Sequence, residues 1–396
     1  MLDIPLSHRA QSIKPSPTLA VTARAAELRA AGKDIIGLGA GEPDFDTPEH
    51  IKEAAIEALR QGQTKYTAVD GTADLKNAII EKFKRENNLE YTKDQISVAC
   101  GAKHSLYNLF QAVLNPGDEI IIPAPFWVSY PDMAKLAEAE PVIIKTTIDE
   151  HFKISPEKLR GAISDKTKMV VFNSPSNPTG VSYNKSELVA LAEVLLDHPE
   201  ILIVTDDIYE HILWGQDKFV NIVNACPKLY DRTIVVNGVS KAYSMTGWRI
   251  GYVGGPKSII KGMNKIQSQS TSNPTSIAQA AAVAALDGDQ TYIEESTKIF
   301  KERHDFVLKA LNEMKGVRCL ASEGTFYSFP DMNELMESME GINNDIELAE
   351  FFLEKAEVAM VPGSAFGAPG CMRISFATSM ENLEKSMERI KKALEN

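Results

Sequence analysis

Residues 237–251 read Asn-Gly-Val-Ser-Lys-Ala-Tyr-Ser-Met-Thr-Gly-Trp-Arg-Ile-Gly. This segment is rich in small residues, joins short apolar runs at 234–236 and 250–253, and carries two cations, Lys241 and Arg249. Such a pair is often simply a solvated lysine and a surface arginine without a function. Beside buried strands, however, a desolvated lysine near a second cation loses proton affinity, as a nucleophilic amine requires. The segment therefore predicts a ligand site in which Lys241 is the nucleophile.

Short apolar runs alternate with helical patterns between residues 95 and 255. The helical segments repeat apolar residues every three or four positions, as Leu106, Leu109 and Phe110 do. Fully apolar strands that alternate with helices are typical of a mainly parallel sheet covered on both faces. We therefore expect an α/β fold whose ligands bind at the carboxyl ends of the strands. The expected strands lie at 96–99, 119–122, 169–172, 201–205, 234–236 and 250–253.

Two helices are expected before the first of these strands. Residues 18–31 are alanine-rich and end at Gly32, a residue favoured directly after a helix. Thr47 and Pro48 have the pattern of an N-cap followed by proline at the first helical position. The buried face of this second helix is expected to hold Ile51, Ala55 and Leu59.

The character of the chain changes near residue 295, where long charged helices begin. The last of them follows Ser379 and repeats apolar residues at helical spacing, namely Met380, Leu383, Met387, Ile390 and Leu394. This part is expected to form a smaller α+β domain together with the N-terminal helix. The predicted boundaries are 46–295 for the large domain, and 1–45 plus 296–396 for the small domain.

Composition and charge narrow the class of protein. The 54 acidic and 42 basic residues give a net charge of −12, which argues against non-specific binding to nucleic acid. The four cysteines form no CxxC pair, which favours free thiols in a reducing compartment over disulfides or a zinc site, and no metal is expected. The sequence has no signal peptide and no apolar stretch long enough for a bilayer. We expect a cytoplasmic protein that binds no membrane.

The motif S-K-A-Y-S-M-T-G-W-R-I-G at 240–251 resembles the pyridoxal-phosphate attachment signature of class I aminotransferases. The chain as a whole is similar to the bacterial aspartate aminotransferases, including those that also accept prephenate. The similarity runs from Ile13-Lys-Pro-Ser to Arg373-Ile-Ser-Phe-Ala-Thr-Ser, so it covers nearly all of the sequence. It implies fold type I of the pyridoxal-phosphate enzymes, with active sites shared across a homodimer and a small domain that closes over them.

The resemblance implies a role for residues around each part of the cofactor. Lys241 would carry pyridoxal 5′-phosphate as an internal aldimine, and once released would move the proton of the substrate Cα. Arg249 would hold the phosphate. The turn at Gly101, Ala102 and Lys103 opens a helix, and the free N–H groups of a helix N-terminus form an anion site, so this turn is expected to hold the phosphate as well.

Asp206 ends a very apolar strand, where a carboxylate is costly to bury without a cation. The protonated pyridine nitrogen would be that cation. The resemblance further implies that Tyr209 and Asn177 bind the phenolic oxygen and that Trp127 stacks on the ring. Tyr66 would reach the phosphate of the partner subunit.

Substrate binding follows from the same resemblance. Arg373 would bind the α-carboxylate, aided by the backbone at Gly41, while Asn177 and Trp127 would also contact the substrate. Because the sequence has no arginine between Arg249 and Arg303, it follows the family branch in which Lys103 binds the distal carboxylate and Lys14 helps to hold prephenate. Lys14 is equally well explained as a solvated N-terminal lysine.

These residues predict reversible transamination between L-aspartate and 2-oxoglutarate, with prephenate as a further substrate. Two alternatives stay open: an aromatic or broad-specificity aminotransferase, and a different pyridoxal-phosphate reaction on the same fold, such as that of a C–S lyase, because a fold does not fix a function. A nicotinamide enzyme is excluded, since the glycines at 37–41 lack the spacing of a dinucleotide fingerprint.

Overall fold

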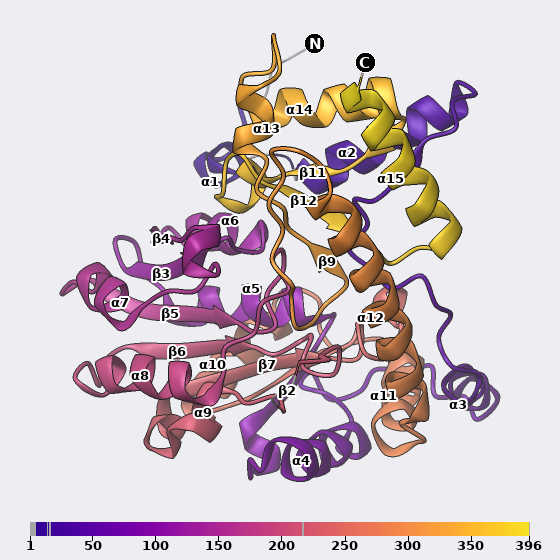
Figure 1. The fold of residues 1–396 in the computed structure, drawn as a ribbon. Coiled ribbons are helices and arrows are strands. Elements are labelled where there is room, and N and C mark those ends of the chain that lie inside the picture. The colour runs from indigo at the N-terminus through magenta and orange to yellow at the C-terminus, as the bar shows by residue number, and fades with distance from the viewer. Residues whose placement is uncertain (1–4, 14, 16, 216–217, 396) are drawn as a thin grey trace.

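The computed structural model in Figure 1 describes residues 5–13, 15, 17–215 and 218–395. Its centre is a seven-stranded sheet in which β8 is antiparallel to both neighbours and every other pair is parallel. This confirms the expected α/β fold with a mainly parallel sheet. The strands are, in spatial order, β2 (Ile96–Ala99), β8 (Gly251–Gly254), β7 (Thr233–Gly238), β6 (Leu202–Asp206), β5 (Thr167–Asn173), β3 (Glu119–Ala124) and β4 (Glu140–Lys145).

Helices cover both faces of this sheet, as fully apolar strands require. Within β3, Ile121 packs into the core on one face, whereas Ile120 and Ile122 pack into the core on the other. The first face is covered by α3 (Glu49–Arg60), α4 (Ala73–Asn87), α7 (Pro156–Ala162), α8 (Lys185–Leu196), α9 (Ile222–Ala225) and α11 (Ser276–Asp287). The second is covered by α5 (Ala102–Val113), α6 (Ser129–Leu136) and α10 (Lys257–Ser268).

The start of α3 corrects the sequence prediction. The residue that precedes the helix is Pro48, not Thr47, whose Oγ1 instead donates to the carbonyl of Ser244 at 2.6 Å. Leu59 is 50% exposed and Ala58 takes the buried position. At about 100° per residue, Ala58 lies roughly 20° around the helix from Ile51, whereas Leu59 lies about 80° away.

A second group of elements lies above the main sheet in Figure 1, and the last described helix of the chain belongs to it. It contains an antiparallel sheet of β11 (Val361–Pro362), β12 (Met372–Ser375) and β9 (Tyr327–Ser328), and a parallel pair of β1 (Ile36–Gly37) and β10 (Val358–Ala359). Its helices are α2 (Pro17–Ala30), α13 (Asn333–Glu337), α14 (Asp345–Phe351) and α15 (Met380–Glu395). The short helix α1 (His8–Ser12) contacts α6.

The long helix α12 (Thr291–Asn312) connects the two groups of elements (Figure 1). The predicted domain boundary at 295/296 falls inside this helix. In addition, Ile208 and Tyr209, which follow β6, pack into the same apolar cluster as Phe326 and Ile374. The loop after β6 is therefore attached to the main sheet through β6 and packs against the second group of elements through Ile208 and Tyr209. None of the helices in the described ranges is long and apolar enough to cross a membrane.

Candidate active site

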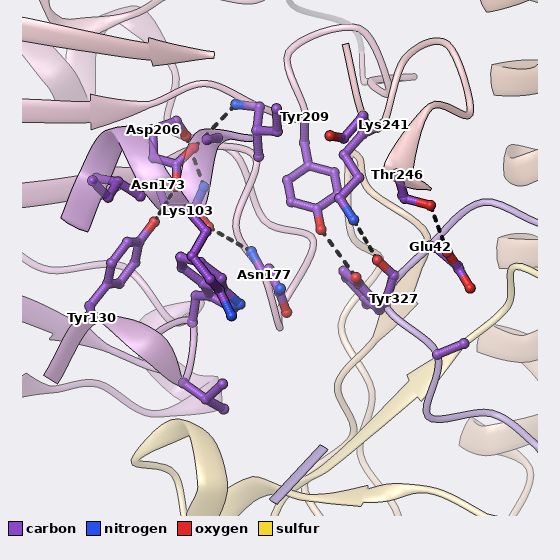
Figure 2. Close-up of a pocket in the computed structure, with 18 of the residues that line it drawn as sticks. Glu42, Lys103, Tyr130, Asn173, Asn177, Asp206, Tyr209, Lys241, Thr246 and Tyr327 are labelled. Atoms are coloured by element: carbon purple, nitrogen blue, oxygen red, sulfur yellow. Dashed lines mark hydrogen bonds between the residues drawn. The ribbon is translucent and has the colours of Figure 1, made fainter. Parts of the chain in front are cut away.

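A cavity of 470 Å³ lies where the carboxyl ends of the central strands face the second group of elements. Asn173 ends β5, Asp206 ends β6, and Lys241 follows β7, while Tyr327 and Arg373 enter from β9 and β12. Figure 2 shows the side chains of Asp206, at the end of β6, and of Lys241, in the loop after β7, directed into one space. The lining residues are Ala40, Gly41, Glu42, Ala102, Lys103, Leu106, Trp127, Val128, Tyr130, Asn173, Asn177, Asp206, Ile208, Tyr209, Ser240, Lys241, Thr246, Arg249, Tyr327 and Arg373.

Lys241 is partly buried in this cavity. Its Nζ donates to the carbonyl of Gly41 and lies 5.8 Å from the ring centroids of both Tyr209 and Phe326. Burial, and then the charge of Arg373, lower the pKa of Lys241 to about 8. The neutral amine, which is the form that acts as nucleophile or base, is therefore far more abundant near physiological pH than in a solvated lysine, although it is still the minor form.

An anion cradle is formed where α5 begins. Gly101 precedes the helix with a φ of +90°, and a Cβ atom there would lie 2.4 Å from Nη2 of Arg249. A Cβ atom on Gly251 would lie 2.1 Å from the backbone nitrogen of Ala102. Arg249 donates to the carbonyl of Thr246 at 2.8 Å, so its guanidinium is held beside the first N–H groups of α5. Free N–H groups at a helix start and a guanidinium together suit a phosphate.

Asp206 carries a buried carboxylate that is only 4% exposed. It forms no ion pair with any of the described residues. Its Oδ2 accepts from the hydroxyl of Tyr130 at 2.6 Å, and its Oδ1 accepts from the N–H of Ile208 at 3.4 Å. Burial raises the pKa of Asp206 to about 6, although these hydrogen bonds and Lys241 oppose the rise. A cationic ligand would give this buried carboxylate the partner of opposite charge that it lacks among the described residues.

Arg373 has the complementary character: it is a buried guanidinium, 2% exposed, that forms no ion pair with a described carboxylate. Its Nη1 donates to Oδ1 of Asn177 at 2.9 Å and its Nη2 to the carbonyl of Gly39 at 2.8 Å. The rings of Tyr327 and Phe366 lie 4.4 Å and 5.0 Å from the guanidinium carbon. Its Nε has no hydrogen-bond partner among the described residues. An anionic ligand would therefore complete this site.

Lys103 and Trp127 stand together at one side of the cavity. Nζ of Lys103 lies 4.9 Å from the Trp127 ring centroid. Burial, and then the nearby charge of Arg249, lower the pKa of Lys103. On the opposite side, the hydroxyls of Tyr209 and Tyr327 are 3.1 Å apart (Figure 2).

Three of the residues named from the sequence need separate comment. Tyr66 is 91% exposed and does not line the cavity of this single chain. Gly41 lines the cavity, but its carbonyl accepts from Lys241, while the carbonyl that accepts from Arg373 is that of Gly39. Lys14 lies outside the described residues. The structure brings the other named residues together around the cavity, with Gly101 placed behind the Arg249 guanidinium.

Among the lining residues that were not identified from the sequence are Tyr130, Asn173 and Tyr327. Asn173 follows an expected strand directly, so the rule that placed Asp206 at the site could also have found it. Tyr130 lies in the first turn of α6, three residues after Trp127, and the sequence did not indicate which way its side chain points. Tyr327 reaches the cavity from the second sheet, and no local pattern predicts that approach.

Asn173 connects the two charged ends of the site (Figure 2). Its Nδ2 donates to the carbonyl of Asp206 at 2.8 Å, and its Oδ1 accepts from the N–H of Asn177 at 2.8 Å. The Asn177 side chain in turn accepts from Arg373. Asn173 and Asn177 therefore link the backbone at the end of β6 to the Arg373 guanidinium.

Comparison with known proteins identifies the family. A profile described as aminotransferase class I and II matches residues 33–390. The aspartate/prephenate aminotransferase of Nitrosomonas europaea is 60% identical over 97% of this chain and 98% of its own length. The aspartate aminotransferase of Bacillus subtilis is 52% identical over 98% of this chain and 99% of its own length.

Solved structures agree with this result. An aspartate aminotransferase from Rhizobium meliloti has a TM-score of 0.96 and 48% identity, with 99% of both chains covered. The aspartate aminotransferase of Thermus thermophilus with maleate has a TM-score of 0.93 and 44% identity, with 99% of this chain and 100% of the other covered. The chain therefore belongs to the class I and II aminotransferase family and is an aminotransferase.

Proposed function

We propose that this aminotransferase uses pyridoxal phosphate to transfer the amino group of L-aspartate reversibly to 2-oxoglutarate, and that it also accepts prephenate. The names of the relatives support these substrates, since they include aspartate and, in the Nitrosomonas europaea protein, prephenate. One observation carries the proposal: the Lys241 amine, the Asp206 carboxylate and the Arg373 guanidinium meet in one cavity, and neither of the last two forms an ion pair with a described residue.

The donor groups of the cavity fit pyridoxal phosphate. The backbone at Gly101, Ala102 and Lys103, together with Arg249, would hold the phosphate, and Asp206 would pair with the protonated ring nitrogen. Tyr209 and Asn177 would bind the phenolic oxygen, and Trp127 would cover the ring face. When bound, the cofactor supplies an electron sink for the charge that develops at the substrate Cα.

Lys241 would act twice in the reaction. Its neutral amine would first attach the cofactor covalently. Once released, its Nζ would take the proton from the substrate Cα and deliver it to C4′ of the cofactor. The lowered pKa of Lys241, about 8, supports both roles because each needs the neutral amine.

The substrate would be held at its two carboxylates. Arg373 would bind the α-carboxylate as a planar fork of donors, with the backbone at Gly41 nearby. Lys103 would bind the distal carboxylate and leave its place on the Trp127 ring to do so. Lys14 would assist with prephenate. A lysine is a point charge on a flexible stem, so it should discriminate among acidic side chains less sharply than an arginine fork.

A substrate panel tests this assignment. The wild-type protein should transaminate aspartate with 2-oxoglutarate, and Lys103→Gln should raise the KM for aspartate about tenfold or more, because hydrogen bonds to charged groups contribute about 1.5–3 kcal/mol. The KM for phenylalanine should change less than twofold. Lys261→Gln, which alters an exposed lysine on α10, is the matched control.

Other outcomes would redirect the proposal. Equal losses for aspartate and phenylalanine in Lys103→Gln would assign Lys103 to the cofactor alone. Phenylalanine preferred over aspartate by the wild-type protein would favour an aromatic aminotransferase. Release of ammonia and pyruvate from a sulfur-containing amino acid, without transamination, would favour the C–S lyase.

We further propose that the protein is a cytoplasmic homodimer with shared active sites. The exposure of Tyr66 and Arg249 in the single chain supports this, since a second copy could cover both. Within each subunit, we propose that residues 46–295 form the cofactor-binding domain and that 1–45 with 296–396 form a small domain that closes over the site.

A further inference from the structure

The environment of Asp206 contains one specific hydrogen-bond donor from a side chain. The Tyr130 hydroxyl donates to Oδ2 of Asp206 at 2.6 Å, and Tyr130 is only 2% exposed (Figure 2). The carboxylate also accepts a longer hydrogen bond from the Ile208 N–H, at 3.4 Å. Among the described residues, the Tyr130 hydroxyl is therefore the closest donor to a carboxylate that forms no ion pair there.

The position of Tyr130 is fixed by packing rather than by this hydrogen bond alone. Its N–H donates to the carbonyl of Trp127 at 3.1 Å where α6 begins. The two rings meet edge to face, with centroids 5.3 Å apart and an interplanar angle of 85°. The start of α6 therefore places one aromatic side chain at the open part of the cavity and a phenol against Asp206.

A hydrogen bond from a neutral donor stabilises the charged form of a carboxylate more than the neutral form. The hydroxyl of Tyr130 works in this direction on Asp206, against the effect of burial. It also occupies Oδ2, which fixes the plane of the carboxylate. Both effects favour an ionised acid in one orientation, as a partner for a protonated ring nitrogen must be.

We propose that Tyr130 is a positioning residue that keeps the Asp206 carboxylate ionised and oriented toward the ring nitrogen of the cofactor. The inference rests on the proposed use of pyridoxal phosphate. In this role Tyr130 touches neither substrate nor reacting atom. It acts through Asp206, so it should affect cofactor affinity and turnover rather than the binding of the amino acid.

The test is Tyr130→Phe, which removes only the hydroxyl and keeps the ring against Trp127. Cofactor titration of the apoprotein, followed by tryptophan fluorescence, should show a dissociation constant raised at least fivefold. The kcat for aspartate should fall at least fivefold, with KM changed less than twofold. Tyr183→Phe is the matched control, because Tyr183 is also buried and its hydroxyl also has one partner, the Ile154 N–H at 2.9 Å. It should stay within twofold of wild type in every measurement.

A double-mutant cycle with Asp206→Asn separates this role from a packing role. If Tyr130 acts through the carboxylate, Tyr130→Phe should weaken cofactor binding by less than twofold in the Asp206→Asn background. An equal loss in both backgrounds would overturn the proposal, and so would a Tyr130→Phe protein within twofold of wild type. Failure of the proposed function looks different, because the wild-type protein would then bind no pyridoxal phosphate at all.

Discussion

Lys241 combines two requirements that conflict in water, since it must be a lysine yet must supply some neutral amine near physiological pH. The cavity resolves the conflict by partial burial and by the charges of Arg373 and Arg249, while Glu42 opposes them. The net result is a pKa of about 8. The amine therefore gains its reactive form as the pH rises through this value.

The pH dependence of cofactor attachment tests that property. The rate at which the apoprotein forms a covalent bond with pyridoxal phosphate should rise up to about pH 8 and then level off. The control is free lysine acetylated at its α-amino group, so that only the side-chain amine can react with the cofactor. The rate of that reaction should go on rising toward the pKa of the side-chain amine, about 10.4. A protein rate that still climbs at pH 10 would contradict the lowered pKa of Lys241.

The sequence alone revealed residues whose chemistry conflicts with their surroundings. Lys241 beside buried strands and Asp206 at the end of an apolar run are both costly unless they have a function, so pattern and chemistry agree on them. Nothing in the sequence around Tyr130 or Tyr327 indicates a functional role, because a buried tyrosine is common in protein cores. Their role depends on which oxygen their hydroxyl meets, and only the folded chain determines that.

At the scale of elements, a buried ionic cluster joins α4 to the ends of β6 and β7. Lys82 is fully buried, and its Nζ donates to Glu210 and to Oδ1 of Asn87 at 2.7 Å. Glu210 also accepts from Nδ2 of Asn237 at 2.7 Å. Burial acts to raise the pKa of Glu210, but Lys82 and His211 hold it below its usual value. The cluster therefore ties the loops that carry Tyr209 and Lys241 to the helix layer.

Lys82→Met should lower the free energy of unfolding by about 3–5 kcal/mol, because it leaves Glu210 as a buried charge without its cation. Urea denaturation of the apoprotein measures the change. Lys84→Met, two residues along the same helix on its exposed side, should alter the free energy by no more than about 0.5 kcal/mol. If both variants were equally stable, the Lys82 cluster would not stabilise the packing of α4 against the ends of β6 and β7.

The elements that could be predicted are those whose residues determine them locally. The six expected strands exist because each is a continuous apolar run inside a covered sheet. Strand β4 was missed, since it contains Pro141, begins and ends with a charged residue, and is largely only partly buried at the sheet edge. The two-residue strands β1, β9, β10 and β11 are set by distant partners, which leave no local pattern.

At the scale of the whole molecule, the proposed dimer predicts complementation between two defective chains. Lys241→Ala lacks the amine but keeps Tyr66, and Tyr66→Ala has the reverse defect. If Tyr66 acts across the interface, a mixed dimer has one site with both residues intact. Mixing and reassociating the two purified variants should therefore raise the activity at limiting cofactor above that of either variant alone.

The control for this experiment is a chain that carries both substitutions, mixed with wild-type protein. In that mixed dimer each site lacks one of the two residues, so activity should fall on mixing. If Tyr66 instead acted within its own chain, the first mixture would gain nothing. The exposure of Tyr66 in the single chain would then need another explanation.

The central claim is that Lys241 carries the cofactor, and peptide mapping after borohydride reduction tests it most directly. Reduction should fix pyridoxal phosphate to the protein irreversibly, and mass spectrometry of the digest should find it on the peptide that contains Lys241 and on no other lysine. Cofactor found on a different lysine, or a protein that retains none after reduction, would contradict the account.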